Sequence, residues 1–88
     1  MAYVYILKSI KSNSYYVGST KDINRRIKQH NAGNVTSTKY KRPYKLVFSQ
    51  EIIDIKQARQ IERKIKNWKR RDFIEKIIKD GYIKILRV

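Results

Sequence analysis

Five side chains along this 88-residue chain have the chemistry needed to hydrolyse a phosphodiester. They are two phenols, a guanidinium, an imidazole and a carboxylate: Tyr5, Tyr16, Arg26, His30 and Glu62. A carboxylate can bind a divalent cation, a guanidinium can hold phosphoryl oxygens, and a phenol or imidazole can accept the proton of an attacking water. These residue types favour metal-assisted attack on a phosphodiester, provided that the fold brings them together.

The net charge favours nucleic acid as the partner. Lysine and arginine total 22 against 7 acidic residues, a formal net charge of +15. Such self-repulsion is usually tolerated because the partner is an anion. An anionic membrane surface is the weaker alternative, since no apolar run approaches the roughly 18–20 residues of a spanning helix. Small ribosomal and nucleoid proteins are equally basic without being enzymes, so charge alone does not predict catalysis.

Length and composition predict one domain, residues 1–88, in the cytoplasm. A chain this short can bury only one small core. It contains no cysteine, which excludes a disulfide framework and a thiolate metal site. The segment from Met1 to Tyr5 has no basic stretch ahead of its apolar residues, so it is not expected to be a secretory signal.

Hydrophobic patterning predicts an α/β fold: a small three-stranded antiparallel or mixed sheet packed by helices, in the order β-β-α-β-α-α. The first two strands are expected to form an antiparallel hairpin. A further short edge strand is predicted at the C-terminus. The expected strands are 3–8, 15–19, 44–48 and 82–86, and the expected helices are 23–31, 55–70 and 73–79.

Residues at the ends of these segments carry capping signals. Asp22 and Asp72 are expected to be the N-caps of the first and last helices, because a carboxylate can accept the free backbone N–H groups there. Gly33 and Gly81 are expected to follow the ends of the same helices. Residues 32–42, which follow the first helix, are polar and basic, and we expect them to form a loop.

Helical periodicity predicts that Arg26 and His30 face the sheet. Ile23 and Ile27 define the buried side of the first helix, and Arg26 flanks it, whereas Arg25 faces solvent. His30 follows one turn after Arg26. Both residues also have a structural explanation, because an arginine stem can pack against a core and a lone histidine near an apolar face is often simply hydrogen-bonded.

Glu62 lies at the border between core and solvent on the long helix. The apolar stripe of this helix consists of Ala58, Ile61, Ile65 and Trp68. A carboxylate beside that stripe can supply an oxygen ligand for Mg²⁺, which takes one or two carboxylates and keeps several waters. It can also merely pair with a neighbouring lysine or arginine.

In these motifs and their spacing, the chain resembles the GIY-YIG nuclease family, especially its small stand-alone bacterial members. The first motif is matched by Tyr3-Val4-Tyr5 and the second by Tyr16-Val17-Gly18. Residues 18–26 are similar to the third motif, with Arg26 at the position of the arginine. His30 matches a histidine or tyrosine found one turn later, and residues 61–63 are similar to the segment that carries the metal-binding glutamate.

Two departures from the family pattern bear on the site. Tyr3 stands where the first motif has glycine. Many members carry an asparagine in the last helix, but the matching residues 73–76 contain none, and Asn67 lies earlier in the chain. The completeness of the site therefore depends on the tertiary structure.

The resemblance implies an endonuclease that uses Mg²⁺ or Mn²⁺ and acts on nucleic acid, most simply DNA, in a process such as DNA repair. Glu62 would bind the ion, Arg26 would hold the phosphoryl oxygens, and Tyr5 would be the phenolate base. Tyr16 or His30 would assist, and nearby cations together with the metal are expected to lower the pKa of Tyr5 from about 10. Gly18 would let the backbone approach a phosphate. The residues expected to contact nucleic acid are Gly18, Lys21, Arg25, Lys39, Lys41, Arg42 and Lys69.

Two other classes remain open at this point. A degenerate nuclease could keep all five residues and only bind nucleic acid. A basic structural component of a ribonucleoprotein particle is less favoured, because it would not need these residues in this register.

Overall fold

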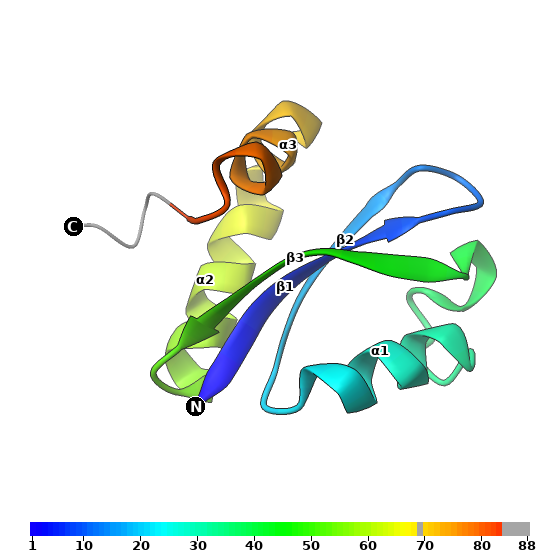
Figure 1. Cartoon of the computed structure of the whole chain (residues 1–88), viewed down its shortest axis with the longest axis horizontal. Helices are drawn as coiled ribbons and strands as arrows, with labels where there is room; N and C mark the ends of the chain where they lie inside the picture. Colours follow the sequence, from blue (N-terminus) through cyan, green and yellow to red (C-terminus); the bar gives the residue numbers. More distant parts are fainter. Residues whose placement is uncertain (69, 84–88) are drawn as a thin grey trace.

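The computed structural model describes residues 1–68 and 70–83 and confirms the α/β fold with the order β-β-α-β-α-α. Its elements are β1 (Ala2–Ser9), β2 (Tyr15–Thr20), α1 (Ile23–Asn31), the 3₁₀ turn η1 (Lys39–Lys41), β3 (Tyr44–Ile52), α2 (Ile55–Trp68) and α3 (Arg71–Asp80). The sheet has the order β2-β1-β3, and β1 pairs antiparallel with both neighbours. Figure 1 shows the helices α1 and α2 separated by this twisted sheet.

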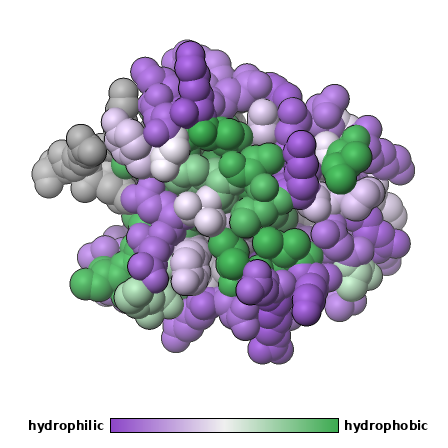
Figure 2. Space-filling model, viewed as in Figure 1, coloured by the Kyte–Doolittle hydropathy of each residue, from purple (hydrophilic) through white to green (hydrophobic). Residues whose placement is uncertain are grey.

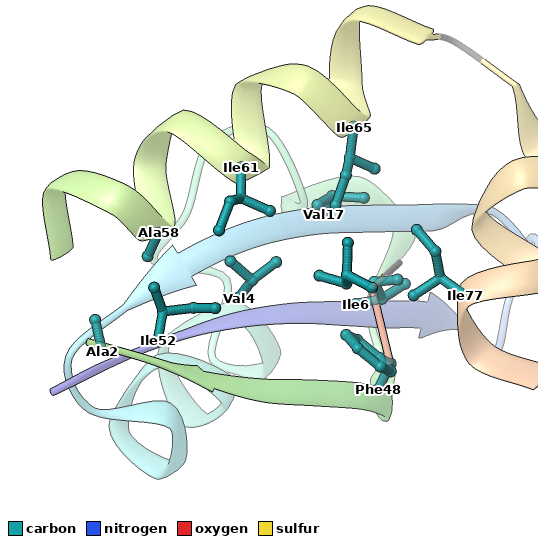
Figure 3. Close-up of a cluster of buried hydrophobic side chains, with 11 residues drawn as sticks. Ala2, Val4, Ile6, Val17, Phe48, Ile52, Ala58, Ile61, Ile65 and Ile77 are labelled. Carbon is teal, nitrogen blue, oxygen red and sulfur yellow. The ribbon is translucent and has the colours of Figure 1, made fainter. Parts of the chain in front are cut away.

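The two faces of β1 bury different side chains, because successive residues of a strand point to opposite faces. Ala2, Val4 and Ile6 point toward α2 and join the main apolar core. In Figure 3 they meet Ile61 and Ile65 of that helix. The alternate residues of β1 point toward α1, in a smaller cluster that consists of Tyr5, Leu7 and Tyr44, with Tyr16, Ile23 and Ile27 packed against it.

Hydrophilic residues cover the periphery of the molecule. In the view of Figure 2 they surround a strip of hydrophobic side chains over the middle of the sheet. No helix among residues 1–68 and 70–83 is long and apolar enough to cross a membrane.

Helix α1 has the bounds that the sequence predicts, because its ends are set by local contacts. The carboxylate of Asp22 accepts a hydrogen bond from the backbone N–H of Arg25 at 3.1 Å, which confirms Asp22 as the N-cap. Gly33 follows the C-cap Ala32 with φ of 82°, a left-handed conformation that favours glycine. His30 lies in the last turn of this helix and is its buried residue.

Strand β3 is longer than the expected 44–48. It continues to Ile52 because its second half pairs with the start of β1, with Ala2 opposite Ile52 and Tyr5 opposite Ser49. A register shift between Ile6 and Leu7 of β1 leaves Val47 of β3 as an extra residue between Leu46 and Phe48.

The boundary between α2 and α3 also differs from the prediction. Helix α2 ends at Trp68 rather than residue 70, and Arg70 is the extended N-cap of α3. Asp72 was therefore wrongly expected to be the cap. It lies in the first turn, where its carboxylate pairs with the guanidinium of Arg70 at 2.7 Å. Gly81 does end the helix, with φ of 79°.

The predicted edge strand 82–86 is not formed by its described part. Tyr82 and Ile83 are not in a strand, and residues 84–86 lie outside the described residues. Ile83 is buried, and its backbone N–H donates to the side-chain oxygen of Gln50 at 2.9 Å. This contact holds the segment after α3 against β3.

Candidate active site

One cleft of about 460 Å³ contains four of the five predicted catalytic residues: Tyr5, Tyr16, Arg26 and Glu62. They come from four different elements, β1, β2, α1 and α2. The full lining consists of Tyr5, Tyr16, Gly18, Ser19, Arg26, Arg59, Glu62, Arg63, Lys66 and Asn67. The fifth predicted residue, His30, lies behind Tyr5 and is fully buried.

The cleft crosses the edge of the sheet at β2. Tyr5 points to the α1 face, whereas Ser19 points to the α2 face and contacts Glu62. Gly18 stands opposite Tyr5 in the register of the two strands. Because β2 is an edge strand, side chains from both faces can meet around it.

Gly18 has a packing role in addition to the predicted one. A Cβ atom at this position would lie 2.4 Å from the hydroxyl oxygen of Tyr5, so the phenol fills the space that glycine leaves. Packing against Tyr5 thus gives one reason for glycine at this position, and the approach of a phosphate stays a prediction. Any larger residue at this position would displace the Tyr5 ring from the edge of the sheet.

Tyr5 begins a buried chain of hydrogen bonds on the α1 side. Its hydroxyl lies 2.9 Å from Nε2 of His30, and Nδ1 of His30 lies 2.7 Å from the hydroxyl of Thr38. The imidazole is also flanked by the rings of Tyr16 and Tyr44, at centroid distances of 5.0 and 6.3 Å. Packing and hydrogen bonding therefore fix both the position and the orientation of His30.

The environment shifts the pKa values of this pair apart. Burial raises the pKa of Tyr5 well above its ordinary value, and Tyr16 adds to the increase, although Arg26 opposes it. Of the nearby cations, Arg26 acts in the predicted direction, but burial outweighs it and the net shift is upward. The contribution of the metal to this pKa stays a prediction. Burial, together with the charge of Arg26, lowers the pKa of His30 to about 4. At neutral pH, Tyr5 keeps its proton and His30 is a neutral acceptor.

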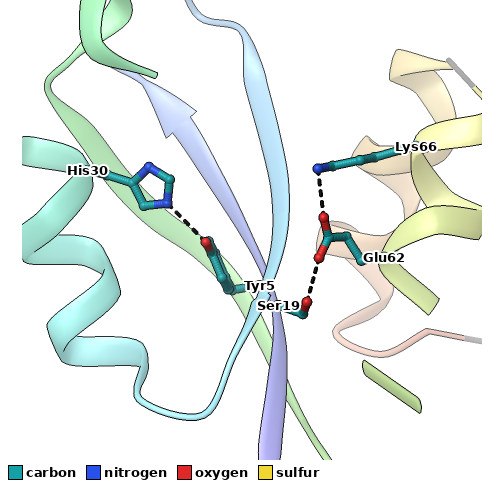
Figure 4. Close-up of polar contacts among 5 residues, drawn as sticks. All are labelled: Tyr5, Ser19, His30, Glu62 and Lys66. Carbon is teal, nitrogen blue, oxygen red and sulfur yellow. Dashed lines mark hydrogen bonds and ion pairs between the residues drawn. The ribbon is translucent and has the colours of Figure 1, made fainter. Parts of the chain in front are cut away.

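Glu62 is held from two sides, as Figure 4 shows. The hydroxyl of Ser19 donates to Oε1 at 2.5 Å, and the ammonium of Lys66, one helical turn away, lies 2.7 Å from Oε2. The same ammonium lies 4.9 Å from the centre of the Tyr16 ring. Glu62 is consequently oriented toward the cleft, and its side chain remains 21% exposed.

The donor set at Glu62 fits a hard divalent cation held by few protein ligands. Mg²⁺ is commonly bound by one or two carboxylates, with waters and substrate phosphates completing the shell. Within residues 1–68 and 70–83, no group of three or more histidine, cysteine or acidic residues could hold a metal. The Glu62 carboxylate, oriented by Ser19, is thus the candidate ligand, and a metal would have to displace the Lys66 ammonium from Oε2 or bind at Oε1.

Helix α2 also contributes residues that were not among the predicted site residues. Arg59, Arg63 and Lys66 line the cleft beside Glu62. Positions three and four residues apart share one helical face, so the i+4 spacing from Glu62 to Lys66 was a usable signal. Asn67 also lines the cleft, which places an amide in the site although α3 provides none at residues 73–76.

A second groove of about 610 Å³ adjoins the first and shares Ser19, Arg26 and Arg59 with it. Lys21 and Arg25, both predicted to contact nucleic acid, line this groove. Arg25 is exposed and Arg26 is half-buried, as the helical wheel predicts. The other predicted basic contacts, Lys39, Lys41 and Arg42, are exposed around η1 and line neither groove, and Lys69 lies outside the described residues.

Comparisons with known proteins cover the same part of the chain. A family model described as the GIY-YIG catalytic domain matches residues 1–77, which include every residue that lines the cleft. The UPF0213 protein SSP2268 of Staphylococcus saprophyticus is 42% identical over 81 residues, or 90% of this chain and 95% of that protein. The UPF0213 protein YazA of Bacillus subtilis is 35% identical over 77 residues, or 83% and 77% of the two chains. The solution NMR structure of the UPF0213 protein BH0048 from Bacillus halodurans is 35% identical, covers 92% of this chain and 87% of that one, and has a TM-score of 0.55.

Proposed function

We propose that this protein is a divalent-metal-dependent endonuclease acting on DNA. The chain belongs to the GIY-YIG catalytic-domain family and is related to small bacterial UPF0213 proteins. The observation that carries this proposal is the convergence of Tyr5, Arg26 and Glu62 on one cleft from separate elements. A structural protein has no evident need for a partly exposed carboxylate, a guanidinium and a buried phenol at one sheet edge.

Arg26 and Glu62 have complementary roles toward a phosphodiester. The guanidinium of Arg26 lines both grooves and can bind the phosphoryl oxygens as negative charge develops on them. Glu62 would hold Mg²⁺ or Mn²⁺, which supplies charge neutralisation at the scissile phosphate and its leaving oxygen. Ser19 keeps the Glu62 carboxylate in position, and Asn67 offers an amide at the same wall of the cleft.

Tyr5 and His30 together can accept the proton of the attacking water. The Tyr5 O–H bond breaks as its proton moves to Nε2 of His30, and the phenol oxygen takes a proton from water. The pKa values oppose this transfer before substrate binds. A phosphate in the cleft would raise the pKa of His30, because a nearby negative charge favours the imidazolium. Tyr16, whose ring lies 5.0 Å from that of His30, closes the same side of the site.

The two adjoining grooves provide a path for the nucleic-acid backbone. Lys21, Arg25 and Arg59 lie along the second groove, and Arg26 stands where it meets the first. If about six phosphates are contacted, the slope of log affinity against log salt should be about −5 on duplex DNA. A slope near zero in filter-binding or anisotropy titrations would contradict this electrostatic path.

The decisive experiment compares wild type with Glu62→Gln. Supercoiled plasmid and branched DNA are incubated with each protein, with and without Mg²⁺ or Mn²⁺. Wild type should cleave only with metal. Glu62→Gln should not cleave, and it should bind DNA as tightly or slightly more tightly because it loses one negative charge. The matched control is Glu75→Gln on exposed α3, which should cleave normally.

A non-catalytic nucleic-acid-binding module is the second candidate, and the ion pair between Lys66 and Glu62 favours it, because this pair occupies the carboxylate. In that case wild type would bind DNA with the same salt dependence and leave every substrate intact in either metal.

A further inference from the structure

Thr38 is a buried polar residue inside an otherwise exposed basic segment. Its neighbours from residue 36 to residue 42 are all exposed, whereas Thr38 itself is fully buried. It directly precedes Lys39 and lies three residues before Lys41, and both lysines are among the expected nucleic-acid contacts. Burying a hydroxyl is costly unless it is hydrogen-bonded, so its partners indicate its role.

The Thr38 hydroxyl does not serve the local backbone as a cap. Thr38 occupies the N-cap position of η1, where threonine commonly accepts a backbone N–H, but it makes no side-chain capping bond there. The hydroxyl instead lies 2.7 Å from Nδ1 of His30 and donates to the backbone carbonyl of Val35 at 3.4 Å. Of its two hydrogen-bond partners, the imidazole is therefore the nearer.

The set of hydrogen bonds around His30 favours one tautomer. If the ring proton is on Nδ1, every proton of the chain has an acceptor: Nδ1–H donates to the Thr38 oxygen, and the Thr38 proton is left for the more distant Val35 carbonyl. With its one ring proton on Nδ1, neutral His30 has a bare Nε2. That nitrogen then accepts the hydroxyl proton of Tyr5 at 2.9 Å. Three hydrogen bonds thus point in one direction, from Tyr5 to Val35.

We propose that Thr38 is a positioning residue that holds His30 in the Nδ1–H tautomer, so that Nε2 can receive the proton of Tyr5. The catalytic use of this pair rests on the proposed nuclease function, whereas the tautomer does not. In the opposite tautomer, Nε2 would already carry a proton and could not accept another from Tyr5. Thr38 would thereby affect the reaction through His30, although Thr38 lines neither groove.

The tautomer can be measured directly because the chain has a single histidine. Long-range ¹H–¹⁵N NMR of wild type with labelled histidine, at pH 7 and without DNA or metal, should show the Nδ1–H tautomer. Thr38→Ser keeps the hydroxyl and should keep that spectrum. Thr38→Val removes the hydroxyl at nearly constant volume and should shift His30 toward the Nε2–H tautomer. An Nε2–H tautomer in wild type, or an unchanged spectrum in folded Thr38→Val, overturns the proposal, and the wild-type measurement decides even if the valine variant does not fold.

Cleavage assays then separate positioning from simple stabilisation. Thr38→Val should lower kcat by about 10–100-fold with little change in KM, the range typical of residues that orient a functional group. Thr38→Ser should restore most of the rate. If Thr38→Val is less stable but cleaves at the wild-type rate, the residue is structural only and the positioning role is wrong. If wild type cleaves no DNA, the nuclease proposal fails while the NMR result on the tautomer stands.

Discussion

Strand β1 separates two regions that are built from alternate residues of one eight-residue segment. On the α2 side, Val4 and Ile6 enter a core that is apolar throughout, where they pack against Ile65. On the α1 side, Tyr5 enters a buried cluster that contains His30 and Thr38 and is crossed by hydrogen bonds. The two regions are similarly inaccessible to solvent but differ in chemistry.

The contrast shows how a very small protein can combine stability with a reactive site. Apolar packing tolerates modest changes of shape, because dispersion and burial are not directional. A buried polar chain depends on each partner, because an unpaired donor or acceptor loses its hydration without compensation. Among the described residues that are not themselves exposed, every buried side-chain nitrogen or oxygen has a hydrogen-bond partner. The α1 region therefore satisfies this demand. We expect changes there to affect activity and changes on the α2 side to affect stability.

Removing one hydroxyl from the α1 side should produce the largest effect. Tyr5→Phe keeps the ring but removes the group that lies 2.9 Å from His30. Cleavage should fall by about 10²–10⁴-fold and lose its alkaline rise, because the water proton has no acceptor. Stability should fall by about 1 kcal/mol, since Nε2 of His30 is left unpaired. Tyr3→Phe, on the same strand face, is the control in both assays, and a normal rate for Tyr5→Phe would move the base role to Tyr16 or His30.

A smaller loss is expected from Arg26→Ala. The guanidinium lines both grooves, so its removal should slow cleavage by roughly 10²-fold if it stabilises the transition state. Arg25→Ala removes the same charge from the exposed neighbour and should mainly weaken binding. Single-turnover rates at saturating protein distinguish the two effects, and equal rates for both variants would show that each acts only as general positive charge.

The pH dependence of stability should show the cost of burying His30. Its pKa of about 4 in the folded protein lies below the ordinary 6.5, so between these values the unfolded chain binds the proton more readily. Stability is therefore lost as pH falls, by about 2 kcal/mol between pH 7 and pH 5. Urea unfolding at both pH values should show this loss in wild type and a smaller one in His30→Gln, and identical losses would contradict the shifted pKa.

The mildest effect should come from the α2 side. Ile65→Val removes one buried methylene and should lower the free energy of unfolding by about 0.5–1.5 kcal/mol. The rate of cleavage per folded molecule should not change, because Ile65 does not line the cleft. Urea unfolding and a cleavage assay on the same preparation provide the measurement. A large loss of activity without loss of folded protein would mean that the two sides of the sheet are coupled.

The sequence by itself determined the features that depend on near neighbours along the chain. The bounds of α1 follow from the Asp22 cap, which needs contacts only three residues away. The buried face of α2 follows from the helical spacing of Ala58, Ile61 and Ile65. The same periodicity distinguished Arg26 from Arg25, because the angle between helical positions does not depend on the rest of the fold.

Only the tertiary structure decided which polar groups meet. Thr38 is eight residues from His30, and Ser19 is 43 residues from Glu62, so neither bond leaves a periodic signal in the sequence. The second half of β3 was missed because polar residues on an edge strand show little alternation, and pairing with β1 forms it nonetheless. The cleft exists because β2 lies at the sheet edge and Gly18 admits the Tyr5 ring. Local preference sets each helix and strand, whereas the register between distant segments sets the chemistry.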